Sequence, residues 1–151
     1  MINFIIEHKD IKDKKFLNKL KKFIHKILKD YKKEEYDLSI LLTNDELIAE
    51  YNKTYRGKSK PTDVLSFSFI EAKEEDFPID IKELGDIIIS IETMKKQAKE
   101  FETTEEEELA RLTIHGVLHL LGFDHEKSEE DERVMFEIQD RYLEEFLQEK
   151  K

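Results

Sequence analysis

The chain of 151 residues contains no cysteine, so it can form neither disulfides nor thiolate metal sites. Any zinc site must therefore be built from histidine and carboxylate side chains. The sequence also lacks an apolar run long enough to cross a membrane, and no apolar signal-peptide region follows Met1. We therefore expect a cytoplasmic protein without a membrane partner.

Only two prolines interrupt the chain, and it contains no internal repeat or low-complexity linker. Its length is that of about one domain, which at this size buries roughly two thirds of the surface that the unfolded chain exposes. Hydrophobic residues make up 38% of the sequence and charged residues 41%. We expect a single domain spanning residues 1–151, with a modest core beneath a very polar surface.

The spacing of apolar residues predicts the secondary structure. Short β-branched or alternating segments predict strands at residues 2–6, 38–42, 64–69 and 84–90. Spacings of three and four predict helices at residues 12–31, from Asn44 through Tyr51, at about 92–100, at about 104–121, and from about Ser128 onward. Residues 71–83 are acidic, contain Pro78, and are expected to form a loop. This order predicts an α+β fold in which a small mixed sheet of about four strands packs with about five helices.

The clearest chemical signal is the segment His115-Gly-Val-Leu-His-Leu-Leu-Gly-Phe-Asp-His125. His115 and His119 are four residues apart, so both imidazoles leave the same face of a helix, one turn apart. Gly122 can adopt φ > 0, end this helix and let the chain bring His125 back. A single histidine on an apolar helix face is usually a core residue, but three converging imidazoles form the ligand set of a catalytic zinc. The spacing predicts one zinc ion per chain, bound by His115, His119 and His125.

The segment from His119 to His125 fits His-x-x-Gly-x-x-His, the downstream half of the metzincin peptidase signature. In those peptidases, a glutamate follows the first histidine and takes a proton from the zinc-bound water. This chain has Gly116 at that position. The chain thus has the histidine ligands of such a peptidase but lacks the glutamate base. This difference counts against proteolytic activity. A site without an evident base also fits a mainly structural role.

The net charge of −10 is unevenly distributed, because residues 1–70 carry +4 and residues 71–151 carry −14. Four cations without an acid between them lie within residues 53–60: Lys53, Arg56, Lys58 and Lys60. A local basic patch can bind a polyanion even on an acidic protein, since salt screens charges beyond about 8–10 Å. A guanidinium can bind two phosphate oxygens at once. We expect Arg56 on a loop just before a strand, where an ordinary solvated basic turn is the alternative.

Two aspartates and two histidines admit simpler explanations. Asp124 beside His125 would either orient a metal ligand or cap the local turn. Asp86 interrupts an apolar strand, which a backbone hydrogen bond at a strand edge explains equally well. His8 and His25 have no ligand spacing, and we expect no metal role for either.

Three blocks of the sequence resemble the YbeY family, the bacterial single-strand-specific endoribonucleases of ribosomal RNA maturation. They are the histidine segment, Tyr55-Arg-Gly-Lys-Ser-Lys-Pro-Thr-Asp-Val-Leu-Ser-Phe67, and Leu84-Gly-Asp-Ile-Ile-Ile-Ser90. The resemblance extends over essentially the whole chain, and the glycine in place of the metzincin glutamate is itself a family feature. One position departs from the pattern: the family usually has proline after Leu-Ser-Phe, where this chain has Ser68. We expect that position to shape the strand or the cleft wall.

The resemblance implies a metzincin-like metal helix, one zinc ion, and cleavage of single-stranded RNA. The expected processes are 3′ end processing of small-subunit rRNA and ribosome quality control. The zinc ligands would be His115, His119 and His125. Arg56 would be the catalytic arginine, and it would bind the substrate together with Lys53, Lys58 and Lys60. The expected partners are single-stranded RNA, small-subunit rRNA, and the ribosome or its assembly factors, with no DNA.

Two alternatives stay open at this stage. One is a metallopeptidase-like hydrolase, and the other is a non-catalytic, metal-stabilised ribosome-assembly factor that binds RNA without cutting it. The sequence gives neither the cleavage site nor the choice between zinc hydroxide and a ribose 2′-hydroxyl as nucleophile. The native metal is also open, since sites of three histidines accept other divalent ions.

Overall fold

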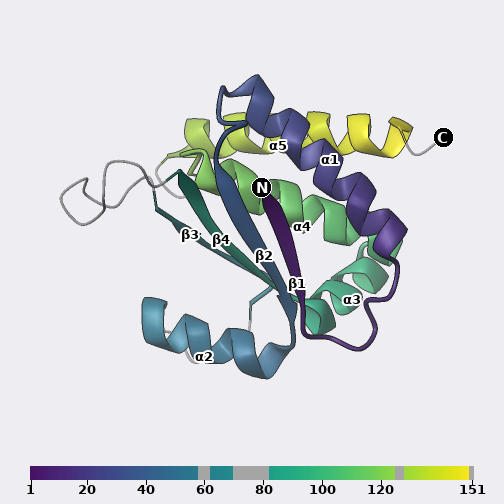
Figure 1. Cartoon of the computed structure of the whole chain (residues 1–151). Coiled ribbons are helices and arrows are strands. Elements are labelled where there is room, and N and C mark those ends of the chain that lie inside the picture. The colour runs from purple at the N-terminus through teal and green to yellow at the C-terminus, as the bar shows by residue number, and fades with distance from the viewer. Residues whose placement is uncertain (58–61, 70–81, 125–127, 150–151) are drawn as a thin grey trace.

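The computed structural model describes residues 1–57, 62–69, 82–124 and 128–149. Within these ranges, four strands and five helices follow one another in the predicted order (Figure 1). The strands are β1 (Ile2–Ile6), β2 (Asp37–Thr43), β3 (Val64–Ser68) and β4 (Glu83–Ser90). The helices are α1 (Lys14–Asp30), α2 (Asp45–Arg56), α3 (Ile91–Glu100), α4 (Glu105–Leu120) and α5 (Glu129–Glu149). The predicted loop at residues 71–83 lies mostly outside the described residues.

The strands form one mixed sheet in the order β1-β2-β4-β3, which confirms the predicted α+β class. β1, β2 and β4 are parallel, whereas β3 pairs antiparallel with β4. Asp37 pairs with Glu83 and Leu38 with Gly85, so Leu84 is the extra residue of a β-bulge. Gly85 has φ +151°, and a Cβ there would come within 2.1 Å of the Phe67 carbonyl oxygen. This position therefore requires glycine.

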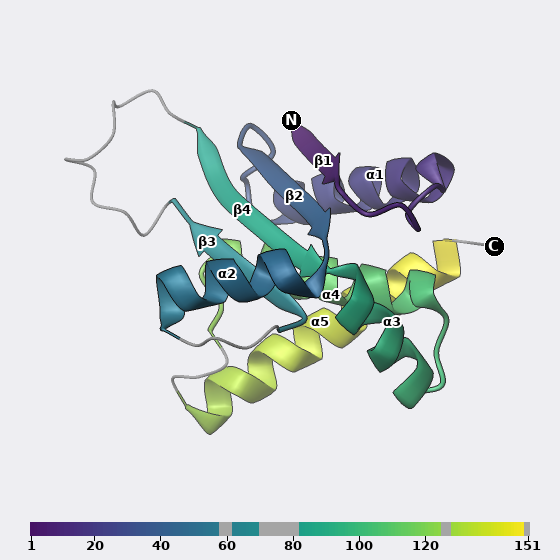
Figure 2. The same ribbon diagram turned by 90° about the horizontal axis from the view of Figure 1, so that it is seen from below.

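The two faces of the sheet are covered very unequally. Ile40 and Ile87 face the main hydrophobic core, to which α1, α3, α4 and α5 also contribute. The neighbouring residue Ile88 points to the other face, where it packs with Leu65 and with Ile48 of α2. Figures 1 and 2 show α2 alone on its side of the sheet. No helix within the described ranges is both long and apolar enough to span a bilayer.

Side-chain caps fix where the helices begin. Asn44 Oδ1 accepts a hydrogen bond of 2.9 Å from the Leu47 N–H, and Thr104 Oγ1 accepts one of 3.0 Å from the Glu107 N–H. Both caps satisfy amides that the first helical turn leaves without partners. At the other end of α4, Gly122 adopts φ +105° as predicted, which stops the helix just after the second histidine.

The structure corrects two expectations. Arg56 is the last residue of α2 rather than part of a loop, and Gly57 caps the helix with φ +69°. The helix continues because Tyr51 and Tyr55 keep an apolar spacing of four, and cations are favoured near a helix C-terminus. The explanation of Asp86 as an edge residue is also wrong, since β4 is paired on both sides by β2 and β3.

Candidate active-site cleft

A cleft of about 720 Å³ lies where α2, β3 and α4 meet. It is lined by the cation Arg56, the histidines His115 and His119, and residues 62–68 of β3 and the segment before it. Arg111, Asp124 and Phe136 also line this cleft. The fold therefore brings the predicted phosphate-binding arginine and two of the predicted metal ligands to one cavity, although they are far apart in the sequence.

The two described histidines are direct neighbours on α4. The ring centroids of His115 and His119 are 4.8 Å apart, with the ring planes at 75°. This arrangement follows from their spacing of four residues on one helical face. His125, the third predicted ligand, lies outside the described residues. Among the residues that the structure describes, no three histidine, cysteine, aspartate or glutamate side chains are grouped to bind a metal.

Helix α5 holds His115 from two sides. The Nδ1 atom of His115 is 2.6 Å from Oε1 of Gln139, whose side chain is almost fully buried, and the Phe136 ring stacks on the imidazole at 6.0 Å. Because an amide oxygen only accepts hydrogen bonds, this contact requires a proton on Nδ1, and a neutral imidazole then has its lone pair on Nε2. Sequence reasoning missed Gln139. The available signal was a polar residue four positions after the buried Met135, on the inward face of a helix.

Gly116 lies where α4 crosses β4. A Cβ at this position would come within 2.8 Å of Cγ2 and 3.1 Å of Cδ1 of Ile87. The Gly116 carbonyl also accepts a hydrogen bond of 3.5 Å from the Ser66 hydroxyl of β3. Position 116 thus faces the sheet, where an added Cβ would overlap the Ile87 side chain unless the helix or that side chain moved. The close packing of α4 on β4 at this point therefore requires a small residue where metzincins have glutamate.

The basic wall of the cleft comes from the end of α2. Arg56, exposed in its last turn, lines the cleft, whereas Lys53, also exposed, is not among the lining residues. Lys58 and Lys60 lie outside the described residues. Tyr55 fastens this turn to the sheet, since its ring lies 5.0 Å from the Phe67 ring of β3. The arginine is therefore attached to an anchored helix end.

Arg111 brings a second guanidinium to the cleft, one helical turn before His115. Its Nε and Nη2 atoms donate to the two carboxylate oxygens of Glu108 at 2.8 and 2.5 Å. Glu108 is buried, and this bidentate hydrogen bonding is the main reason that the pKa of Arg111 is raised further. Sequence reasoning missed this residue too, although Glu108, Arg111 and His115 have helical spacing.

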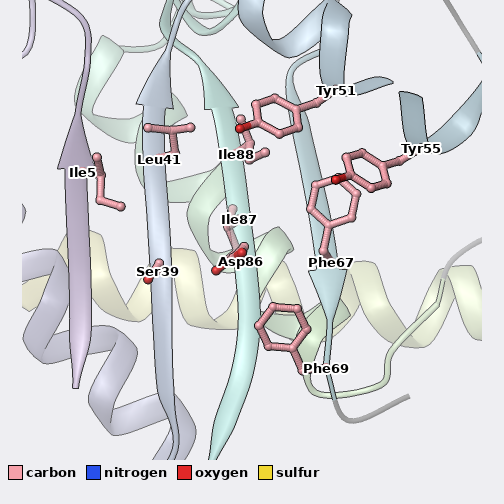
Figure 3. A pocket seen from close by; sticks show the side chains of 10 residues that line it. All are labelled: Ile5, Ser39, Leu41, Tyr51, Tyr55, Phe67, Phe69, Asp86, Ile87 and Ile88. Atoms are coloured by element: carbon pink, nitrogen blue, oxygen red, sulfur yellow. The ribbon is translucent and has the colours of Figure 1, made fainter. Parts of the chain in front are cut away.

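Asp86 lies away from the histidines, in a second cavity of about 590 Å³ on the face of the sheet that carries α2 (Figure 3). Apolar and aromatic side chains dominate its lining, among them Ile5, Leu41, Tyr55 and Phe67. Burial raises the pKa of Asp86 above its ordinary value. His8 and His25 do not line the cleft: His8 Nδ1 accepts a hydrogen bond from the Asp10 N–H, and His25 is exposed on α1.

Comparison with known proteins gives one consistent family. Residues 1–147 match the family model described as endoribonuclease YbeY. The endoribonuclease YbeY of Petrotoga mobilis is 43% identical over 145 residues, covering 96% of this chain and 93% of that protein. That of Sulfurihydrogenibium sp. is 45% identical over 140 residues, covering 92% and 90%. The solution structure of TM1509 from Thermotoga maritima has a TM-score of 0.69 at 35% identity and covers 99% of this chain and 91% of that one.

Proposed function

The chain belongs to the YbeY endoribonuclease family, and we propose that it cleaves single-stranded RNA in the cleft between α2, β3 and α4. The observation that carries this proposal is the presence of Arg56, His115 and His119 in one cavity. The proposal assigns the scissile phosphate to the space between the basic helix end and the two imidazoles. It makes the enzyme a hydrolase of phosphodiester bonds.

The packing around Gly116 favours a phosphodiester over a peptide as the substrate. A metzincin-type reaction needs a carboxylate base at this position, and Ile87 occupies the space that such a side chain would need. Phosphodiester cleavage instead requires groups that stabilise negative charge on the non-bridging oxygens. A guanidinium suits this task because its N–H groups match the oxygen geometry bidentately.

We propose that the cleft binds one zinc ion through His115, His119 and His125. The two described imidazoles fit this role, since they are adjacent and Gln139 engages the nitrogen of His115 that a metal would not use. A chain without cysteine also has only nitrogen and oxygen ligands to offer. When bound, zinc would supply a Lewis acid that polarises a phosphate oxygen or lowers the pKa of water to about 7.

The cations at the end of α2 and shortly after it in the sequence would bind and orient the RNA. Arg56 would contact the phosphate at which charge develops, while Lys53, Lys58 and Lys60 would follow the neighbouring backbone. Binding through several phosphates predicts activity that falls with rising salt concentration. Asp124, which also lines the cleft, would orient a metal ligand.

Family membership also supports a cellular role. We propose small-subunit rRNA as the substrate, with 3′ end processing and ribosome quality control in the cytoplasm as the processes served. The ribosome or its assembly factors would be the partners. A non-catalytic assembly factor is the second candidate, because the described part of the cleft shows no carboxylate in the place of the metzincin base.

The test compares wild type with His119→Ala, and with His25→Ala as a control at an exposed position of α1. We expect about one zinc per chain in wild type and in His25→Ala, and cleavage of single-stranded RNA but not of a duplex or of DNA. His119→Ala should lose the metal and the cleavage while keeping its melting temperature and RNA affinity. Stoichiometric zinc in His119→Ala would remove the site assignment. Combined loss of metal, fold and RNA binding would favour the assembly factor.

A further inference from the structure

We propose that Gln139 is a positioning residue that holds His115 in its metal-binding tautomer and orientation, and does so without adding charge to the cleft. This inference rests on the proposed metal site. It concerns a residue of α5, far from the histidine segment in sequence, whose side chain reaches the imidazole across the interface with α4.

The contact is built into the core. The Gln139 side chain is only 1% exposed, and its Oε1 lies 2.6 Å from Nδ1 of His115. Phe136, one turn earlier on the same face of α5, stacks on the imidazole with the ring planes at 28°. The buried Met135 and Phe146 anchor α5 in the main core. The ring is thus held at one edge and on one face by a helix that cannot easily move.

The chemistry of the amide determines which ring nitrogen is left for a metal. A histidine ligand coordinates through one nitrogen, while the other donates to an acceptor that fixes the ring. Because Oε1 of Gln139 accepts from the Nδ1 proton, Nε2 has the lone pair. Fixing the tautomer and ring orientation in advance removes an entropy cost from metal binding. Loss of such a contact typically weakens metal affinity 10–100-fold.

The neutrality of Gln139 is the second part of the inference. Metal-binding histidines often donate to a carboxylate, which makes the ring a stronger ligand. A carboxylate here would also place a buried negative charge behind a cleft whose proposed substrate is a polyanion. The amide orients the ring equally well and leaves the positive charge of a metal site uncompensated. We therefore expect Gln139 to favour RNA binding over the tightest metal binding.

The experiment measures zinc affinity by competition with a chelator, and affinity for a short single-stranded RNA, on the purified full chain. Gln139→Met keeps the length of the side chain but removes the acceptor, and should weaken zinc binding about 10–100-fold. Gln139→Glu keeps the acceptor, and should bind zinc at least as tightly as wild type but RNA more weakly. Thr113→Val is the matched control, because it removes a buried hydroxyl of α4 that donates to the Leu109 carbonyl. It should leave both affinities unchanged.

A spectroscopic measurement separates positioning from stability. In ¹H–¹⁵N correlation spectra of the zinc-loaded protein, the Nδ1 proton of His115 should exchange slowly with solvent in wild type and Thr113→Val, and faster in Gln139→Met, which has no hydrogen-bond acceptor for it. Unchanged zinc affinity in Gln139→Met would overturn the inference while leaving the metal site intact. Should that variant fail to fold, weaker zinc binding or unchanged RNA binding in Gln139→Glu would overturn it. A wild type that binds no zinc would overturn the metal site and the inference together.

Discussion

The two faces of the sheet make different contributions to the cleft. One face lies beneath α1, α3, α4 and α5, and its core fixes both histidines on α4. Among the described elements, only helix α2 lies on the other face. It is attached through Ile48 and the Tyr55–Phe67 contact and ends in Arg56. The two layers meet around the edge strand β3. In the function proposed above, the thick face would hold the metal-binding histidines in place, whereas the thin face would present the exposed Arg56 to the substrate.

This contrast predicts that the thick face tolerates substitution badly. Gly116→Glu should show the largest effect, because it would drive a charged side chain into Ile87 and cost several kcal/mol of a total stability of about 5–15 kcal/mol. Gly116→Ala should destabilise by about 1–2 kcal/mol, since overpacking outweighs the higher helix propensity of alanine. Urea unfolding of both variants measures this. We expect little folded Gly116→Glu.

A double-mutant cycle with Gly116→Ala and Ile87→Ala tests whether the contact with Ile87 causes this destabilisation. Shortening the neighbour with Ile87→Ala should be destabilising alone, but it makes room for the new Cβ. The combined variant should therefore be more stable than the sum of the two single effects predicts. Additive effects would show that contact with the sheet is not what excludes a side chain at position 116. A stable Gly116→Glu with peptidase activity would contradict both this explanation and the choice of substrate.

On the thin face, substitution should affect activity and leave the fold intact. Arg56→Ala should lower kcat/KM for single-stranded RNA by about 10²–10³-fold, the loss typical of one group that stabilises developing charge. Arg56→Lys should recover only part of it, because an ammonium lacks the bidentate geometry. Zinc content and melting temperature should not change, because Arg56 is exposed at a helix end.

The control for this prediction is Arg133→Ala, an exposed arginine of α5 that forms ion pairs with Glu130 and Glu137 on the same helix. It changes the net charge by the same amount away from the cleft, so it separates a local role from a general electrostatic one. If both variants lost the same fraction of kcat/KM, Arg56 would act only through the overall charge of the protein and not through contact with the phosphate. A drop in the zinc content of Arg56→Ala would show that the two faces are not independent.

Sequence reasoning succeeded where a pattern is local. The spacing of His115 and His119, the Asn44 and Thr104 caps and the turn at Gly122 each depend on a few consecutive residues, and the structure confirms each of these local arrangements. Arg56 was predicted to lie on a loop but is the last residue of α2. The error arose because Gly57 is compatible both with a loop and with the left-handed cap that ends a helix. Gln139, Arg111 and the contact at Gly116 depend on how helices pack, which spacing along one chain does not encode.

The smallest expected effect concerns Asp86, the acid in the apolar cavity of the thin face. Burial raises its pKa above the ordinary value of 3.8, so the folded state keeps this proton to a higher pH than the unfolded chain does. Below pH 3.8 the carboxyl is protonated in both states and costs the folded protein no stability. As the pH rises from there through the folded-state pKa, the folded protein loses stability because it must bury a charged carboxylate. Asp86→Asn, which stays neutral, should therefore stabilise the protein at pH 7, on the scale of about 0.5 kcal/mol that half-buried surface positions show.

The pH dependence makes this last prediction specific. The stability advantage of Asp86→Asn should shrink as the pH falls from 7 toward 4, because the wild-type carboxyl becomes neutral as well. Thermal unfolding at several pH values measures the difference, with Asp140→Asn at an exposed position of α5 as the control. An advantage that is constant with pH would mean that shape or hydrogen bonding, rather than charge, distinguishes the two side chains. A destabilised Asp86→Asn would show that the thin face needs this charge for its own packing.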